Sequence, residues 1–234
     1  GGHGSFVSTS PLNRMVTALN RLQSSRMPAQ FGDVTKKFLR EVSRTQSFPS
    51  SWLVRNAYKP VVRTLVANKL AAIPAIDAML RDTVTLTSVQ SGAGTNVAPD
   101  SAIASLDVRL LPSTDKTDFL RRLKSALGDD SVIIESADPP PIVDSSATDS
   151  EFFRALNRVI VQRAPDSIVT PIQTPVGTDS RFFRSKGAHA YGLLPAILTQ
   201  ADLDTIHGAN ERISVTNLEF GTRIIYETLL ELCA

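Results

Sequence analysis

The chain has 234 residues, 42% of them hydrophobic and 21% charged, which is enough to bury the core of one large or two small globular domains. The net charge is only +2 and there is no dense block of Lys or Arg, so we expect neither a nucleic acid nor a membrane surface as a partner. The single cysteine, Cys233, excludes an internal disulfide and leaves the compartment undetermined, and no stretch reaches the about 20 apolar residues of a membrane span.

The N-terminal part predicts a strand followed by an amphipathic helix. Residues 4–8 favour a short strand, and Ser10 and Pro11 suit the N-cap and the first position of the helix that follows. Apolar residues then recur at the spacing of one buried helical face. They are Leu12, Met15, Val16, Leu19 and Leu22.

Residues 27–82 predict a helical insertion. Apolar spacing indicates helices around residues 38–42, 61–71 and 75–80, and four prolines separate them. The segment is far longer than the about 4–6 residues of an ordinary connection, so we interpret it as inserted into a smaller fold.

Two strands, a helix and a further strand follow the insertion. Residues 83–89 and 102–111 alternate between apolar and polar side chains, as strands do, and a Gly-rich loop separates them. Thr114 or Asp115 caps the next helix, Gly128 ends it, and residues 132–134 favour one more strand. Without the insertion the order is β-α-β-β-α-β, which is the split βαβ or ferredoxin-like pattern.

The three prolines at 139–141 form the best internal boundary. We therefore expect a ferredoxin-like domain at residues 1–138, carrying the insertion at about 27–82, and a second α/β unit at residues 139–234. In this second unit the pattern predicts helices at 150–163, 179–186 and 215–232 and short strands at 168–169 and 190–193. The fold class is therefore mixed α and β (α/β, of the α+β kind).

Two residues of the second unit could carry chemistry. His207 lies in a polar loop ahead of the last helix, where an imidazole could bind a metal ion; on local evidence alone a surface histidine is favoured. Arg181 follows Gly177 and Thr178 on a turn that enters a helix, where a guanidinium could hold a carboxylate bidentately. The plain alternative is that Arg181 pairs on the helix surface and that Asp179 is an N-cap.

Two residues of the first unit are weaker candidates. His3 could donate a hydrogen bond to a developing oxyanion, or could be an ordinary residue of a frayed terminus. Asn96 lies between two predicted strands, where an asparagine usually serves to form a turn. His189, just ahead of a predicted strand, receives no role.

The order of these motifs is more specific than any one of them. Gly-His-Gly-Ser at 2–5, Asn-Val-Ala-Pro at 96–99, Gly-Thr-Asp-Ser-Arg at 177–181 and His-Gly-Ala-Asn-Glu at 207–211 follow one another. This series resembles the co-catalytic dinuclear zinc peptidases and amidohydrolases, which include aminoacylase, succinyl-diaminopimelate desuccinylase, carboxypeptidase S and the N-fatty-acyl amino acid synthase/hydrolase. The insertion and residues 78–83 are most similar to the carboxypeptidase S and N-acyl amino acid hydrolase branch.

The resemblance implies a ferredoxin-like lid that forms a homodimer, followed by the C-terminal part of a zinc-binding catalytic domain. It implies that His207 binds zinc and that Arg181, beside the backbone of Gly177 and Thr178, holds the substrate carboxylate. It also implies that His3 and Asn96 reach into the active site of the partner subunit, where His3 stabilises the oxyanion. The implied substrate is an N-acyl amino acid or a peptide C-terminus, and the intact enzyme would hold two zinc ions.

The sequence departs from this family in two ways. Val176 stands where a second glycine often precedes the Gly-Thr-Asp motif. The other metal ligands of the family and its Glu-Glu general base precede the lid, and no His-x-Asp motif occurs in these 234 residues. We therefore expect a C-terminal fragment of a hydrolase that is inactive alone.

Two alternatives stay open at this point. The chain could be a non-catalytic ferredoxin-like dimerisation module, which would dimerise without binding zinc. It could also be a regulatory module that binds free amino acids at the lid interface, away from Arg181. If the hydrolase interpretation is correct, Arg181 and His207 should face a common cleft.

Overall fold

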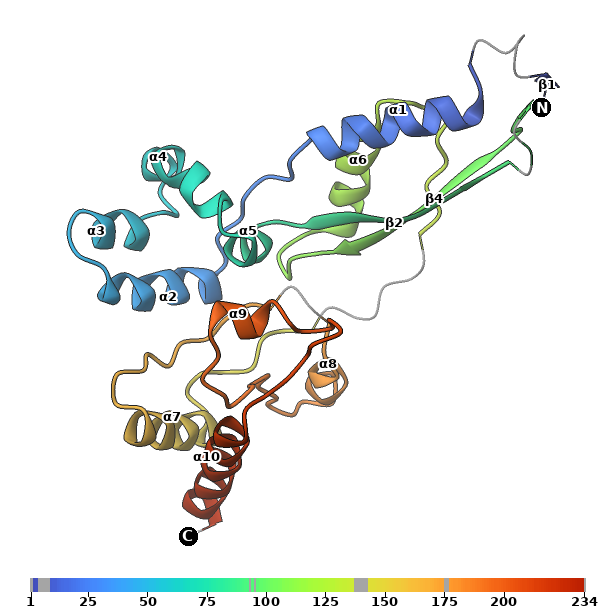
Figure 1. The fold of residues 1–234 in the computed structure, drawn as a ribbon. Coiled ribbons are helices and arrows are strands. Elements are labelled where there is room, and N and C mark those ends of the chain that lie inside the picture. Colours follow the sequence, from blue (N-terminus) through green and yellow to red (C-terminus); the bar gives the residue numbers. More distant parts are fainter. Residues whose placement is uncertain are drawn as a thin grey trace. The chain divides into compact units, whose positions relative to one another are not determined.

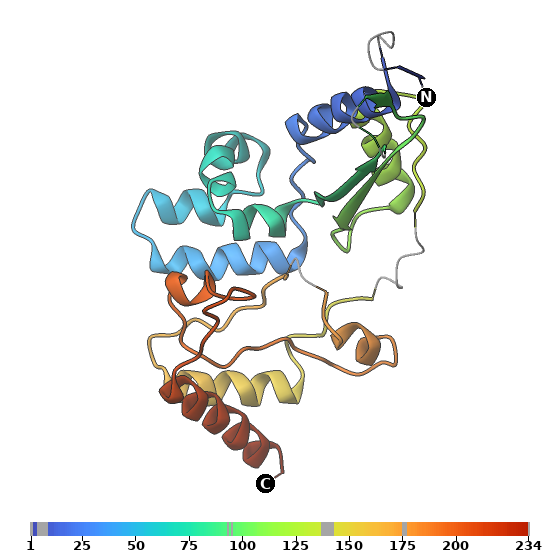
Figure 2. The same cartoon turned by 45° about the vertical axis from the view of Figure 1, so that its right-hand side comes forward.

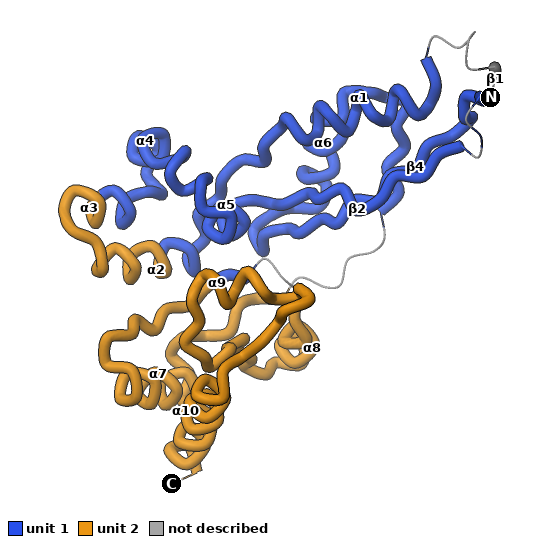
Figure 3. The backbone as a smooth tube through the Cα atoms, in the orientation of Figure 1, with its two compact units in different colours: residues 1–36, 53–141, 173–176 blue, residues 37–52, 142–172, 177–234 orange. Residues whose placement is uncertain are grey.

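The computed structural model describes residues 2–3, 9–92, 94, 96–136, 143–174 and 177–233. The backbone separates into two units, shown in different colours in Figure 3. Unit 1 comprises residues 1–36, 53–141 and 173–176, and unit 2 comprises residues 37–52, 142–172 and 177–234. The domain boundary at residue 138, between the expected lid and the expected catalytic domain, stays a prediction.

Two helices of unit 1 pack on one antiparallel pair of strands. Helix α1 (Pro11–Ser24) begins as predicted, because the Ser10 hydroxyl accepts from the backbone N–H of Asn13 and Pro11 occupies the first turn. Helix α6 (Lys116–Leu127) has Asp115 as its N-cap and ends at Gly128, whose φ of +62° is a left-handed conformation that glycine adopts without strain. Figures 1 and 2 show both helices beside the strands.

The strands are β2 (Thr83–Ser91) and β4 (Ala102–Arg109), and Val84 lies opposite Val108 in their register. Between Leu86 and Ser88 the register shifts by one residue, so the strand contains a β-bulge. Their helix-facing side chains pack on a core of buried residues from α1 and α6. This core consists of Ala18, Leu19, Leu22, Phe119, Leu123 and Leu127.

A second antiparallel pair joins the N-terminus to the loop between β2 and β4. It consists of β1 (Gly2–His3) and β3 (Val97–Ala98), with Gly2 opposite Ala98 and His3 opposite Val97. The predicted strand at 4–8 lies outside the described residues, whereas β3 is a strand that the alternation pattern did not reveal.

The predicted insertion is helical. It contains α2 (Asp33–Val42), a 3₁₀ turn (Ser43–Thr45), α3 (Ser50–Arg55), α4 (Pro60–Ala71) and α5 (Pro74–Leu80). The division between the two units passes through α2 and α3. Prolines stand at the first turn of α4 and α5, where the missing N–H has no helical partner to lose.

Asp82 connects the end of the insertion to the end of β4. Its side chain is buried, and Oδ1 accepts from the backbone N–H of Leu111 at 2.8 Å and from the Thr114 hydroxyl at 2.7 Å. Gln30 donates to the same hydroxyl oxygen at 2.8 Å. Asp82, within the run 78–83, therefore fixes the start of β2 against the turn that leads into α6.

Unit 2 is held together by a pair of helices, α7 (Glu151–Arg163) and α10 (Val215–Cys233). Leu156 and Val159 of α7 pack on Ile224 of α10. Gly221 lets α10 approach the chain closely, because a Cβ at this position would lie 2.5 Å from the carbonyl oxygen of Pro195. Two short helices, α8 (Ser180–Arg184) and α9 (Gln200–Leu203), precede α10.

Three predicted strands are absent from the described residues: those at 132–134, 168–169 and 190–193. Val132 and Ile134 pack on the core while Ile133 is 83% exposed, so the alternation of a strand is present. No hydrogen-bonded neighbour among the described residues completes it. Alternation is a property of the segment, but a strand requires a partner elsewhere in the chain.

The overall class is α+β, as predicted. None of the helices in the described part of the chain is both long enough and apolar enough to cross a membrane.

Candidate active site

His207 lies in a tight turn after α9. Its φ is +62°, and it is the one non-glycine residue with a positive φ among the described residues. The backbone N–H of His207 donates to Glu211 Oε2 at 3.2 Å, and Gly208 N donates to the carbonyl oxygen of Thr205 at 2.8 Å. These bonds hold a left-handed residue in place and leave its imidazole exposed. Such strain is a pointer to function.

The start of this loop is anchored by a capping box. The Thr199 hydroxyl accepts from the backbone N–H of Asp202, and the Asp202 carboxylate accepts from both the N–H and the hydroxyl of Thr199. The Thr199 hydrogen bonds, and the nearby Arg212 guanidinium to a smaller extent, lower the pKa of Asp202 from its ordinary value. Asp202 is therefore a carboxylate at neutral pH.

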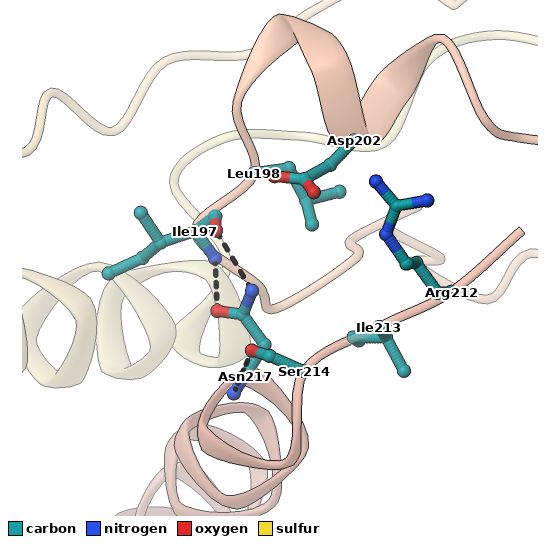
Figure 4. Close-up of a pocket in the computed structure, with 7 residues that line it drawn as sticks. All are labelled: Ile197, Leu198, Asp202, Arg212, Ile213, Ser214 and Asn217. Atoms are coloured by element: carbon teal, nitrogen blue, oxygen red, sulfur yellow. Dashed lines mark hydrogen bonds between the residues drawn. The ribbon is translucent and has the colours of Figure 1, made fainter.

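A partly open hollow of about 350 Å³ lies beside the loop. Figure 4 shows the Asp202 carboxylate and the Arg212 guanidinium facing each other across it. Asn217 closes one side, because its amide both donates to and accepts from the backbone of Ile197 at 2.9 Å. The lining residues are Ile197, Leu198, Asp202, Arg212, Ile213, Ser214 and Asn217.

Arg181 lies on the exposed surface of α8. Its guanidinium carbon is 4.7 Å from the ring centroid of Phe182, a cation–π contact. Asp179 makes no side-chain cap bond to α8, and the described residues contain no ion pair to Arg181. The guanidinium therefore has an aromatic support and its donors are available to a carboxylate.

Gly177 and Thr178 are both exposed, directly ahead of α8. The carbonyl oxygen of Thr178 accepts from the backbone N–H of Arg181 at 3.3 Å, so this turn orients the start of the helix.

The β1–β3 pair brings His3 and Asn96 close together along the backbone. His3 lies opposite Val97, the residue that directly follows Asn96. The two candidates that the sequence assigned to the lid therefore share one end of unit 1. Asn96 is exposed.

The candidate residues fall into two groups. His3 and Asn96 belong to unit 1, whereas Gly177, Thr178, Arg181 and His207 belong to unit 2. No hydrogen bond or ion pair in the described residues joins Arg181 to His207, and neither residue lines the hollow of Figure 4. Their common cleft stays a prediction.

The described residues do not make a metal site by themselves. They contain no group of three or more His, Cys, Asp or Glu side chains that could hold a metal ion. A zinc site in an enzyme uses about three protein ligands, and His207 would supply one.

Asp202 and Arg212, which line one hollow, were not predicted from the sequence. A signal was present, because Thr199 and Asp202 have the Thr-x-x-Asp spacing of a capping box. Arg212 lines the same hollow as this carboxylate, which local spacing does not reveal.

Residues 1–134 match the family model described as the peptidase dimerisation domain. The chain belongs to the M20 peptidase dimerisation-domain family. The match covers α1, the insertion, the β2–β4 pair and α6.

Curated relatives extend the similarity into unit 2. The chain is 27% identical to "Probable carboxypeptidase S-like 2" of Dictyostelium discoideum over 93% of its own length and 42% of the relative. It is 29% identical to the human "N-fatty-acyl-amino acid synthase/hydrolase PM20D1" over 92% of its length and 43% of the relative. The chain therefore spans about two fifths of the length of these relatives.

The similarity extends to a solved structure. The M20 family metallo-carboxypeptidase Sso-CP2 from Sulfolobus solfataricus superposes with a TM-score of 0.55 at 16% identity, over 97% of this chain and 54% of that one. At this identity the likeness shows the α+β fold of this family and carries no residue roles.

Proposed function

We propose that this chain provides the lid and the C-terminal part of the catalytic domain of a zinc-dependent amidohydrolase. Residues 1–138 are the lid and dimerisation domain, and residues 139–234 belong to the catalytic domain. The enzyme cleaves the amide bond of an N-acyl amino acid or the C-terminal bond of a peptide. The observation that carries the proposal is that relatives named as carboxypeptidase and acyl-amino acid hydrolase align with more than 90% of the chain, through both units.

In this proposal His207 contributes one metal ligand. Its exposed imidazole and left-handed backbone, held by Glu211, support a role outside packing. The remaining ligands and the general base come from a segment that corresponds to the unmatched part of the relatives.

Arg181 binds the carboxylate of the substrate. The contact with Phe182 orients the guanidinium while leaving its N–H donors available, and the backbone of Gly177 and Thr178 lies just ahead of it. Two parallel hydrogen bonds to one carboxylate would select for substrates with a free C-terminal carboxyl group.

His3 and Asn96 act across a homodimer. The family name of residues 1–134 supports a dimer formed through unit 1, and the β1–β3 pair groups the two residues at one end of that unit. His3 donates a hydrogen bond to the oxyanion in the active site of the partner subunit.

The exposed face of α10 supports the assignment of unit 2 to a larger domain. This helix leaves a row of large apolar side chains in solvent, more than a free-standing helix pair would carry. A further segment of the catalytic domain would cover them. They are Val215, Leu218, Ile225, Tyr226, Leu229 and Leu230.

The test is amide hydrolysis by the chain joined to the N-terminal catalytic half of one of its relatives. We expect hydrolysis of an N-acyl amino acid that a chelator abolishes and added zinc restores. His207→Ala should reduce the rate at least 100-fold, whereas His189→Ala, which removes another exposed histidine of unit 2, should leave it within about twofold. Activity that survives both chelation and His207→Ala would refute the proposal.

The dimerisation module without catalysis is the second candidate, favoured by the incomplete metal site in the described residues. Calorimetric titration of the joined protein with zinc separates the two. The hydrolase predicts zinc binding that weakens in His207→Ala, whereas the module predicts that His207→Ala leaves zinc binding to the added half unchanged.

A further inference from the structure

Helix α8 carries Arg181 but has few contacts of its own that would keep it in place. It has five residues, and a helix this short is not stable in isolation. None of its five side chains is buried, and Asp179 makes no side-chain cap bond at its start. Neither packing in a core nor an N-cap therefore positions Arg181.

A glycine turn fixes the end of α8. The N–H of Gly187 donates to the carbonyl oxygen of Arg184 at 2.9 Å, and the N–H of Ala188 donates to the carbonyl oxygen of Phe183 at 3.1 Å. These two bonds form a Schellman motif, and Gly187 has the left-handed φ, +83°, that this motif requires. The chain therefore leaves α8 in a defined direction, toward Ala190.

The Arg184 side chain joins this turn to Ser146, which lies 38 positions earlier in the sequence. Its Nε donates to Ser146 Oγ and to the carbonyl oxygen of Ala190, both at 3.1 Å, and its Nη2 donates to the same carbonyl oxygen at 2.7 Å. The Ser146 hydroxyl donates to the carbonyl oxygen of Ala190 and accepts from the Ala190 N–H, both at 2.9 Å. We name Ser146, Arg184 and Ala190 the Arg184 network.

The residue after Ala190 connects the network to α7. The hydroxyl groups of Tyr191 and Ser150 are hydrogen-bonded at 2.6 Å, and Ser150 is the N-cap of α7. The Tyr191 ring also lies against Phe153 of α7, with 5.4 Å between the ring centroids. Among the described residues, no other side chain of α8 forms a hydrogen bond outside its own turn. The position of α8 within unit 2 therefore depends on Arg184.

We propose that Arg184 is the positioning residue that holds Arg181 in place for the substrate carboxylate. Arg184 follows Arg181 by one turn of the same helix, so loss of its hydrogen bonds would displace the Arg181 guanidinium together with its support from Phe182. Displacing a substrate-binding group by about 1 Å can cost on the order of 100-fold in rate. Arg184 acts through Arg181, because its own Nε and Nη2 donate to Ser146 and Ala190. The inference rests on the proposed function of Arg181.

The first test is hydrogen exchange of the full chain, followed by mass spectrometry. Arg184→Gln should accelerate exchange of the amides at 185–190 at least fivefold, while the amides of α7 and α10 keep the protection they have in the parent. Ser146→Ala should accelerate the same amides without any change within α8, so it serves as a second variant if Arg184→Gln does not fold. Lys186→Gln, which removes an exposed cation next to the network, should leave the exchange within twofold.

The second test is steady-state kinetics of the joined enzyme on an N-acyl amino acid. Arg184→Gln should raise KM at least tenfold and change kcat less than threefold, and Lys186→Gln should change neither. Arg184→Lys keeps the charge and one donor to Ala190, so it should raise KM only about threefold. In the presence of Arg181→Lys, Arg184→Gln should raise KM by less than a further twofold, because both changes disable the same interaction.

Two results would overturn the inference. One is unchanged exchange at 185–190 in both Arg184→Gln and Ser146→Ala. The other is an effect of Arg184→Gln on KM that is equally large with and without Arg181→Lys, which would show that Arg184 acts independently of Arg181. Absence of hydrolysis by the unaltered joined enzyme would instead refute the proposed function, and the exchange measurement would still decide whether the Arg184 network holds α8.

Discussion

At the scale of single residues, buried polar contacts fix positions that hydrophobic spacing leaves free. Asp82 is 3% exposed and accepts from Leu111 N and the Thr114 hydroxyl, so one carboxylate aligns the start of β2 with the turn before α6. The sequence offered both Thr114 and Asp115 as caps of α6. The structure assigns the cap to Asp115 and directs Thr114 to Asp82.

Asp82→Ala should lower the free energy of unfolding by about 2–4 kcal/mol, because it leaves a buried N–H and a buried hydroxyl without their acceptor. Urea unfolding followed by circular dichroism measures the change. Asp107→Ala is the control, since Asp107 is exposed and pairs with Arg109 on its own strand, and it should change stability by less than about 0.5 kcal/mol. Equal losses would show that Asp82 has no special role.

Arg181→Lys should raise the KM of the joined enzyme about 10- to 100-fold while changing kcat much less. Lysine keeps the charge but loses the bidentate geometry and the stacking on Phe182. Steady-state kinetics on an N-acyl amino acid measures the two constants. Lys186→Gln, an exposed cation just after α8, should leave KM unchanged. A KM unaffected by Arg181→Lys would remove Arg181 from the substrate site.

At the scale of elements, the α7–α10 pair depends on an apolar contact and on ion pairs at its edge. Arg163 donates to Glu227, and this hydrogen bond holds the pKa of Glu227 below its ordinary value. A carboxyl group with a lowered pKa in the folded state stabilises the fold above the pKa of the unfolded chain. This contribution disappears as the pH falls through that value, about 4.3, and below it.

Glu227→Gln should therefore destabilise the chain at pH 7 and have little effect near pH 2. Chemical denaturation at both pH values, with the difference between variant and parent taken at each, measures this dependence. Glu219→Gln, on the same helix and exposed, should give a difference that does not vary with pH in this way. An equal difference for Glu227→Gln at both pH values would mean that the ion pair adds no stability.

The elements that sequence predicted well are those whose signals are local. Ser10 with Pro11, and Asp115 with Gly128, identify the ends of α1 and α6 because caps act within one turn. The prediction of a strand at 190–193 is wrong, because the segment has no hydrogen-bonded partner strand in the described residues. Helix α9 was not predicted, because a helix of four residues is too short to show a helical spacing of apolar residues.

The candidate site was predictable as a set of motifs but not as a geometry. His207 and Arg181 were found from the order of short motifs, yet the left-handed turn at 207 and the support from Phe182 appear only in the structure. The contact between β1 and β3, which places His3 next to Asn96 along the backbone, joins residues more than 90 positions apart and leaves no local signal.

At the scale of the whole molecule, the chain is similar to part of longer proteins. The family of residues 1–134 is named for dimerisation, and the relatives are more than twice as long as the matched region. Within unit 2, Val215, Leu218 and Leu230 of α10 are among the exposed large apolar side chains.

We expect the chain to form a homodimer through unit 1. Light scattering coupled to size exclusion, at several concentrations and in 0.5 M NaCl, should give twice the mass of 25.3 kDa. Fusion to a relative's catalytic half should keep this stoichiometry, because the interface lies elsewhere. A monomer at every concentration in both forms would contradict the prediction.

The turn at His207 has a consequence for engineering this protein. A left-handed backbone costs a residue with a Cβ on the order of 1–2 kcal/mol, and glycine avoids this penalty. A screen that selects only for thermal stability should therefore favour glycine at position 207. The selected variants would then lack the imidazole of His207. If His207 is the metal ligand that we propose, thermostabilised libraries should be made in the joined enzyme and sorted for zinc affinity first.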